Sequence, residues 1–252
     1  MIKKIVCLFT LIYSPFTLAI ENSDWELTLG IAPLIAPEYE GADEYRVIPV
    51  PQVEVEYQDT YFFSFFRGLG ANLINTRQIQ AGPAMTYRLW QDEDSNPALK
   101  GLGDIPGTLE LGGFINYYLS YIRLGADIKQ GVNGHRGAIA NFSAEFYGKI
   151  GEKISYALGP RYAWADENYM ETYFGIDTKQ ASRSDLDVYS PGAGSKEIGI
   201  GGFLGYTFND RWQVSTFGRL TRLLNPAADS PIVEDEGTPT QLTLAFSLAY
   251  TF

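Results

Sequence analysis

The last twelve residues, QLTLAFSLAYTF, place apolar and polar side chains in strict alternation. Even-numbered positions from Leu242 to Phe252 are aliphatic or aromatic, and the odd-numbered positions are small or polar. Because successive side chains of a strand point to opposite faces, this segment predicts a strand with one wholly apolar face. Such a strand suits lipid on one side and a polar lumen on the other, which favours an outer-membrane β-barrel. We expect Leu248, Tyr250 and Phe252 to form its membrane-assembly signal.

The amino-terminal residues support the same location. Lys3 and Lys4 precede an apolar stretch that is too short to span a bilayer, and Ala19 ends a plausible cleavage site. Residues 1–19 are therefore predicted to be a signal peptide, and residues 20–252 a single transmembrane barrel domain. Cys7, the only cysteine, lies inside the predicted signal peptide. The net charge of −11 argues against a nucleic-acid partner, because nucleic acids require a basic surface.

Strand-like runs recur along the rest of the chain, separated by turn residues. We expect twelve antiparallel strands, at about 25–34, 46–57, 60–66, 69–75, 78–90, 108–119, 121–130, 137–149, 153–166, 195–208, 211–224 and 240–252. With both ends in the periplasm, an even number of strands places the long connections outside and tight turns in the periplasm. This asymmetry is typical of outer-membrane barrels, and it supports an all-β, antiparallel, twelve-stranded barrel in the bacterial outer membrane.

Charged residues within the expected strands follow the polar parity, which would point them into the lumen. They are Glu54, Glu56, Arg88, Glu110, Arg123, Asp127, Glu145, Lys149, Arg161, Glu197 and Arg219. On the lipid face a charge would cost about 2–4 kcal/mol near the midplane, whereas in a lumen it can pair or be hydrated. Glycines at other inward positions predict a tightly filled interior.

The expected outer loops carry clusters of acidic residues, such as 92–94 and 234–236. Solvated loop surface explains them without a ligand. Alternatively, divalent cations could bridge them to outer-membrane lipid and lipopolysaccharide, because hard cations prefer carboxylate oxygens.

Several short motifs resemble the MipA/OmpV family of outer-membrane proteins. The first block contains Pro37, Tyr39, Gly41, Asp43, Tyr45 and Arg46, followed by Pro49 and Pro51. Further blocks are residues 68–73, then Tyr169, Tyr173, Phe174 and Gly175, and finally Asp229, Ser230 and Pro231 before the terminal strand. They occur in the family's order and cover nearly all of the expected mature chain.

The resemblance implies an outer-membrane barrel. For MipA itself it implies a scaffold that brings a lytic murein transglycosylase together with a murein polymerase. Other family members are associated with osmotic response, adhesion and antibiotic susceptibility. The family has no agreed catalytic residues, so none is assigned here, and we expect neither a cofactor nor a bound metal. The motif residues are expected to shape the outer loops or to contact a partner, a ligand or lipid.

An enzymatic function needs a nucleophile and a base that are held together. His135, the only histidine, lies in the glycine-rich segment 131–137 with no accompanying serine motif, so we expect an exposed histidine on a flexible loop. The sequence therefore favours a non-enzymatic scaffold over two other classes, a small-solute channel and an adhesion or stress-response protein. A scaffold of murein enzymes would have to use the periplasmic rim, with Ile20–Asp24, Asp59, Arg77, Gly151–Glu152 and Asn209–Asp210.

Overall fold

The computed structural model describes residues 24–252, so the predicted signal peptide, residues 1–19, lies outside the described residues. The strands are β1 (Trp25–Pro37), β2 (Tyr45–Tyr57), β3 (Tyr61–Ser64), β4 (Gly68–Ala71), β5 (Ile74–Asn75), β6 (Ile79–Arg88), β7 (Thr108–Leu119), β8 (Ile122–Gly131), β9 (Ala138–Ile150), β10 (Ile154–Ala165), β11 (Gly194–Thr207), β12 (Trp212–Leu223) and β13 (Thr240–Thr251). Their bounds lie within a few residues of the predicted ones.

These strands form one closed antiparallel barrel. Except for β4 and β5, neighbours in the chain pair with one another, and β13 pairs with β1. Both β4 and β5 pair with β6, so together they fill one position in the wall. The wall therefore has twelve positions, which confirms the predicted twelve-stranded barrel. The single strand predicted at 69–75 is split at residues 72–73, where the pairing with β6 shifts by one residue, from Gly70 opposite Ala84 to Ile74 opposite Ala81.

The two faces of the wall have different chemistry. Outward side chains are aliphatic or aromatic and stay exposed, as with Ile31 at 66% and Val47 at 67%. Exposure of this kind is expected of residues that face acyl chains. Inward, Glu145 of β9 accepts hydrogen bonds from both Arg123 and Arg161, so charges predicted for the lumen are paired there.

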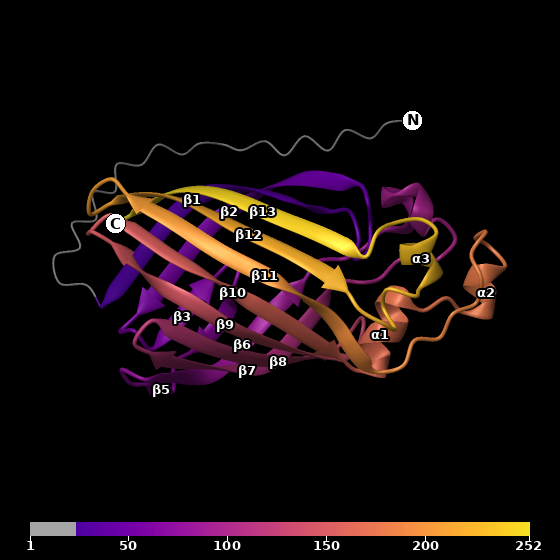
Figure 1. The fold of residues 1–252 in the computed structure, drawn as a ribbon, viewed down its shortest axis with the longest axis horizontal. Helices are drawn as coiled ribbons and strands as arrows, with labels where there is room; N and C mark the ends of the chain where they lie inside the picture. The colour runs from indigo at the N-terminus through magenta and orange to yellow at the C-terminus, as the bar shows by residue number, and fades with distance from the viewer. Residues whose placement is uncertain (1–23) are drawn as a thin grey trace.

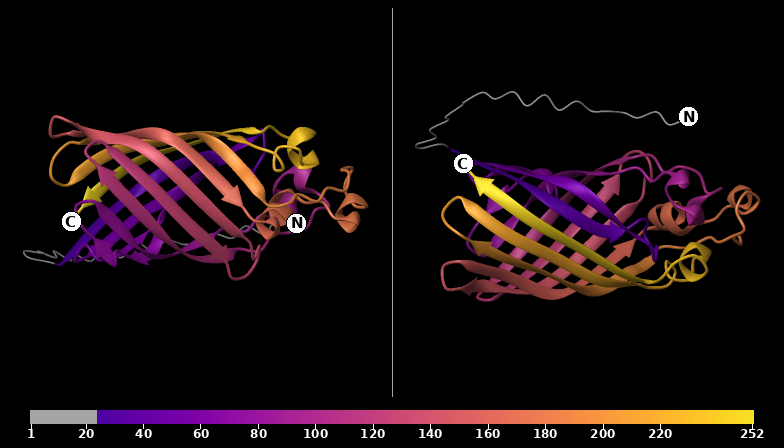
Figure 2. Two further views of the ribbon diagram at one scale, coloured as in Figure 1. Left: turned by 60° about the horizontal axis from the view of Figure 1, so that its bottom comes forward. Right: turned by 90° about the horizontal axis from the view of Figure 1, so that it is seen from above.

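The two ends of the barrel also differ (Figures 1 and 2). Short turns, the start of β1 and the carboxyl terminus lie at one end, which by the rule for such barrels faces the periplasm. The helices lie at the other end, called the outer end here: η1 (Glu93–Ser95), η2 (Pro97–Leu99), α1 (Glu167–Phe174), α2 (Thr178–Ala181) and α3 (Pro231–Glu234). Across residues 24–252, none of the helices is long and apolar enough to cross a membrane.

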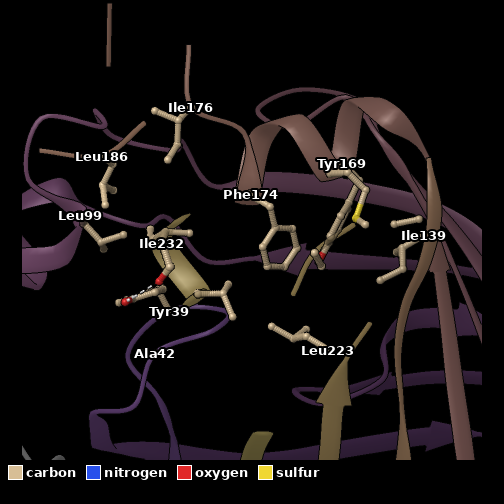
Figure 3. Close-up of a cluster of buried hydrophobic side chains, with 14 residues drawn as sticks. Tyr39, Ala42, Leu99, Ile139, Tyr169, Phe174, Ile176, Leu186, Leu223 and Ile232 are labelled. Carbon is tan, nitrogen blue, oxygen red and sulfur yellow. Dashed lines mark hydrogen bonds between the residues drawn. The ribbon is translucent and has the colours of Figure 1, made fainter. Parts of the chain in front are cut away.

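The outer connections pack into a compact layer over the barrel mouth. We call residues 38–44, 89–107, 132–137, 166–193 and 224–239 the outer cap. The hydrophobic cluster of the structure lies in it, and its largest fully buried side chains are Tyr169, Phe174, Leu99, Met170 and Ile176 (Figure 3). The main apolar core is therefore at the outer end and not in the lumen.

Candidate functional site

Three of the sequence motifs meet in the outer cap. Tyr39, from the β1–β2 loop, donates its hydroxyl to the carbonyls of Ile232 at 3.3 Å and Glu236 at 3.0 Å in the β12–β13 loop (Figure 3). Ser230 donates to the carbonyl of Phe174, at the end of α1, at 2.6 Å. Segments separated by up to about two hundred residues are thus joined by side-chain to backbone bonds, and this makes the cap one unit.

A glycine allows a close approach in this unit. Gly41 has a φ of +107°, a conformation that side chains rarely adopt, and an added Cβ would lie 2.5 Å from Val233 Cγ2. Its N–H donates to Gln241 Oε1 at 3.1 Å, at the start of β13. The first motif therefore needs glycine here for two reasons, backbone conformation and space.

Glu40 joins the cap to the barrel wall. Its Oε1 accepts from the Tyr169 hydroxyl at 2.7 Å and from Arg88 at 3.1 Å, and its Oε2 accepts from Lys196 at 2.7 Å. Arg88 in turn binds Glu110 at 2.9 Å. One carboxylate thus connects α1, β6 and β11 through charge-assisted bonds, which are the stronger class.

The surroundings of Glu40 fix its charge. Burial by itself raises the pKa of this carboxyl. The positive charges of Lys196 and Arg88 and the hydrogen bonds from Lys196 and Tyr169 outweigh burial, and they lower the pKa from 4.5 to about 2. Burial raises the pKa of the Tyr169 phenol far above its usual value of 10, so this hydroxyl stays a donor. Glu40 therefore stays ionised and Tyr169 stays protonated over the physiological range.

A β-bulge brings Lys196 into this network. Trp164 of β10 pairs with Ser195, but Ala163 pairs with Glu197, so Lys196 is the extra residue of β11. Strict alternation from Ile198 would place Lys196 on the lipid face. The bulge instead turns it inward, where it is 5% exposed and binds Glu40 and Glu197. Sequence periodicity missed this residue because a bulge leaves no periodic signal.

The expectation that His135 is an exposed loop histidine is wrong. Its side chain is buried; Nε2 lies 3.1 Å from Glu110 Oε1, and Nδ1 accepts from the N–H of Gly137 at 3.0 Å. Because Nδ1 is an acceptor, Nε2 carries the proton and donates to the carboxylate. The ring also packs against Tyr169, with centroids 5.3 Å apart. Within residues 24–252, the hydrogen bonds of the two ring nitrogens go to Glu110 and Gly137, which makes this histidine part of the outer cap.

The remaining motif residues lie around the same unit. Gly175 ends α1, its N–H donating to Glu171 at 3.0 Å, and Pro231 begins α3. The Tyr45 hydroxyl accepts from the N–H of Leu242 at 3.1 Å. Asp43 and Asp229 are exposed. In Figure 1 these segments cover the outer end.

Other motif positions lie in the barrel wall and at its ends. Pro37 ends β1, Pro49 and Pro51 lie within β2, and Arg46 is at the outer end of that strand. Tyr173, in contrast, lies in α1 of the outer cap, where its ring packs against that of Tyr169 with centroids 4.7 Å apart. The residues of the expected assembly signal are at the end of β13 and just after it, at the periplasmic end of the barrel. They are Leu248, Tyr250 and Phe252.

The acidic clusters are spread over the cap surface, and some of their carboxylates accept hydrogen bonds from backbone N–H groups. Glu93 Oε2 accepts from the N–H groups of Gly101 and Gly103, and Asp92 caps η1. Among the described residues, no group of three or more histidine, cysteine or acidic side chains is placed to hold a metal ion.

A closed antiparallel barrel with an apolar outer face and short turns at one end is an outer-membrane β-barrel protein. The profile of the family described as "MltA-interacting protein MipA" matches residues 29–252. The chain therefore belongs to the MipA family, in agreement with the motifs that resemble MipA/OmpV proteins, and it is located in the bacterial outer membrane.

Named relatives agree with this membership. Outer membrane protein Omp26La of Vibrio anguillarum is 27% identical over 199 residues, 75% of this chain and 70% of that one. The MltA-interacting protein of Escherichia coli (strain K12) is 25% identical over 241 residues, 93% and 94% of the two chains. Among solved structures, the CymD monoaromatic hydrocarbon channel matches with a TM-score of 0.43 and 10% identity, covering 91% of this chain and 88% of that one. The KdgM porin matches with a TM-score of 0.42 and 6% identity, covering 89% and 99%.

Proposed function

We propose that this barrel is a non-enzymatic scaffold that holds a lytic murein transglycosylase, and with it a murein polymerase, at the outer membrane. The observation that carries the proposal is the match to the MipA family over residues 29–252. A relative that aligns over 94% of its length is named for its interaction with MltA. Our proposal extends that named interaction to this chain.

The periplasmic rim offers a surface for such a partner. Asp59, Arg77, Glu152 and Asp210 lie on four of its turns, and all four are exposed. Within the described residues, none of these side chains makes an ion pair. Charges that have no internal partner are free to pair across an interface, where they set partner choice and association rate.

The test is capture of a purified lytic murein transglycosylase by the folded barrel. The rim variant combines Asp59→Ala, Arg77→Ala, Glu152→Ala and Asp210→Ala. The matched control changes the same number of exposed charges in the outer cap: Asp94→Ala, Lys100→Ala, Asp187→Ala and Glu234→Ala. Loss of capture by the rim variant alone supports the proposal. Equal capture by both variants would exclude the rim, and no capture by the parent barrel would exclude the scaffold.

The alternatives predict different readouts. A small-solute channel should show single-channel conductance in planar bilayers, and substitution of Arg88, Arg123 or Arg161 should alter it. An adhesion or stress-response protein should lose surface binding when residues 170–190 are deleted while the barrel still assembles. The packed outer cap favours neither an open pore nor flexible binding loops, so we rank both behind the scaffold.

A further inference from the structure

The barrel wall is incomplete at one place in its outer half. β3 pairs with β2 only between Glu54 and Tyr57, and β4 pairs with β6 at Met85 and Ala84. Beyond those pairs, no strand of the described chain lies between residues 45–52 of β2 and the outer end of β6. Figure 1 shows that β3 and β5 lie toward the periplasmic end. We call this gap the β2–β6 window.

Two prolines lie on the open edge of the window. The N–H of Phe65 donates to the carbonyl of Val53 at 3.2 Å, so odd-numbered residues of β2 direct their backbone groups toward this side. By the same alternation, Pro49 and Pro51 present no N–H to the gap. Prolines are confined to sheet edges because they cannot donate to a ladder. The edge is therefore poorly suited to pair with an added peptide strand.

The side chains along the two sides of the window are apolar. Val47 of β2 is 67% exposed and Trp90, just beyond β6, is 63% exposed. The β3–β4 turn adds Phe65 and Phe66 at the border nearer the periplasmic end, and both are exposed. At the border nearer the outer end, the Asn96 amide donates to Glu38 at 2.8 Å and to Glu44 at 3.0 Å. The outer cap therefore closes the window on this side. Apart from its border with the outer cap, the window is therefore lined by exposed apolar side chains, which suit contact with acyl chains.

A cavity of about 410 Å³ borders the window at Arg46 and Trp90. This volume is within the range of roughly 300–1,000 Å³ that is usual for small-ligand sites. Leu34, Ala36, Leu89, Trp90 and Leu223 supply the apolar part of its wall. Charged side chains, among them Glu40, Arg88, Lys196 and Glu197, supply the polar part, and Arg46 also lines it. The cavity thus joins the window to the space beneath the outer cap.

Arg46 differs from the other cations that line this cavity. Arg88 and Lys196 bind Glu40, and Arg219 lies 3.6 Å from Glu197. In the described part of the chain, the Arg46 guanidinium has no hydrogen bond or ion pair of its own. A guanidinium without a partner, placed beside a cavity whose wall is partly apolar, matches a ligand that has an anionic head and an apolar tail.

We propose that the β2–β6 window admits the acyl chain of an anionic amphiphile from the outer leaflet, and that Arg46 binds its carboxylate or phosphate. The chain enters the cavity between Val47 and Leu89, and the head stays at the level of Arg46. A free fatty acid and a single-chain phospholipid share this chemistry. The proposal is independent of the scaffold function, because the periplasmic rim and the β2–β6 window lie in different halves of the barrel.

The experiment uses the folded barrel in phosphatidylcholine nanodiscs, with dansyl-undecanoic acid as the probe and empty nanodiscs as the background. We expect saturable binding, with energy transfer from tryptophan to dansyl that falls in Trp90→Phe. Arg46→Gln should lower the affinity for the acid by about tenfold and leave that for its methyl ester unchanged, because only the acid is charged. The matched control is Arg222→Gln, an exposed arginine at the outer end of β12, which should change neither affinity.

A second pair of variants tests the window itself. Val47→Trp should narrow the opening and weaken binding several-fold, whereas Ile31→Trp, at an equally exposed lipid-facing position, should not. Competition by lysophosphatidylglycerol would identify membrane lipid as the source, and competition by palmitate alone would identify free fatty acid. No saturable binding, equal effects of the two tryptophan variants, or displacement of the probe by an extended peptide of residues 60–72 would overturn the proposal.

Discussion

The hydroxyl of Tyr169 donates to Oε1 of Glu40 at 2.7 Å, which links two family motifs that lie 129 residues apart in the sequence. The same tyrosine packs against Arg88, whose guanidinium carbon is 5.2 Å from the ring centroid. These contacts explain why the acidic residue Glu40 can lie beneath the packed apolar layer of the outer cap. The phenol and the two cations together solvate the carboxylate, so the cap can close over it.

Replacement of Glu40 by glutamine should loosen the outer cap without unfolding the barrel. Lys196 and Arg88 would each lose one ionic partner and keep another, so we expect a loss of about 1–3 kcal/mol in cap stability. Trypsin cleavage after Lys179 or Arg183 in the folded protein measures this directly. Asp94→Asn, an exposed acid of the cap, is the control. Equal cleavage of Glu40→Gln and the parent would contradict the role of Glu40.

The pH dependence of the cap follows from the same residue. The pKa of Glu40 falls from an ordinary 4.5 to about 2 on folding, so its contribution is fully present above pH 4.5 and is lost as the pH falls toward 2. A nitroxide on Val188→Cys should therefore gain mobility between these values. In Glu40→Gln this transition should be absent. A transition of the same size in both proteins would assign it to other carboxyl groups.

Much of the fold could be predicted from the sequence, because alternation with a period of two is imposed by the difference between lipid and lumen. The twelve wall positions and most strand bounds follow from that pattern alone. Lys196 and His135 could not be placed in this way. The position of Lys196 depends on a bulge, and that of His135 depends on a carboxylate 25 residues earlier in the chain. Neither contact has a local signature.

The motif prolines show a similar limit. Pro49 and Pro51 could be assigned to a strand end or a bulge, since proline removes a ladder donor. The structure places them within a long strand, on an edge that has no partner. Their position depends on the shortness of β3 and β4, which have four residues each.

Gly41→Ala should destabilise the cap more than an ordinary glycine substitution. Its φ of +107° is unfavourable for alanine, and the new Cβ would lie 2.5 Å from Val233 Cγ2, so we expect a cost of about 1–3 kcal/mol. Gly192→Ala is the matched control, because it is also in a cap loop and an added Cβ there meets nothing within 4 Å. Hydrogen exchange of residues 231–236 reports the difference.

A second substitution separates the two causes. In Gly41→Ala with Val233→Ala the steric conflict is removed and the backbone strain remains. We therefore expect Gly41→Ala to lower protection less in the Val233→Ala background than in the parent protein. Exchange rates in Gly41→Ala that match those in Gly192→Ala would mean that this turn tolerates a side chain, and that the packing of the first motif does not require glycine.

The carboxyl-terminal aromatic residue should matter for assembly more than for the stability of the finished barrel. Phe252 is 57% exposed and packs on Tyr250 with ring centroids 4.8 Å apart, while its N–H donates to the carbonyl of Leu27 at 3.0 Å. Phe252→Ala keeps the backbone bond and removes only an exposed ring, so refolding in detergent should be nearly unchanged. If the ring is part of the assembly signal, the amount of heat-modifiable barrel in cell envelopes should fall several-fold. Phe208→Ala, at 51% exposure on the same rim, is the control, and an equal fall in both variants would assign the effect to general rim hydrophobicity.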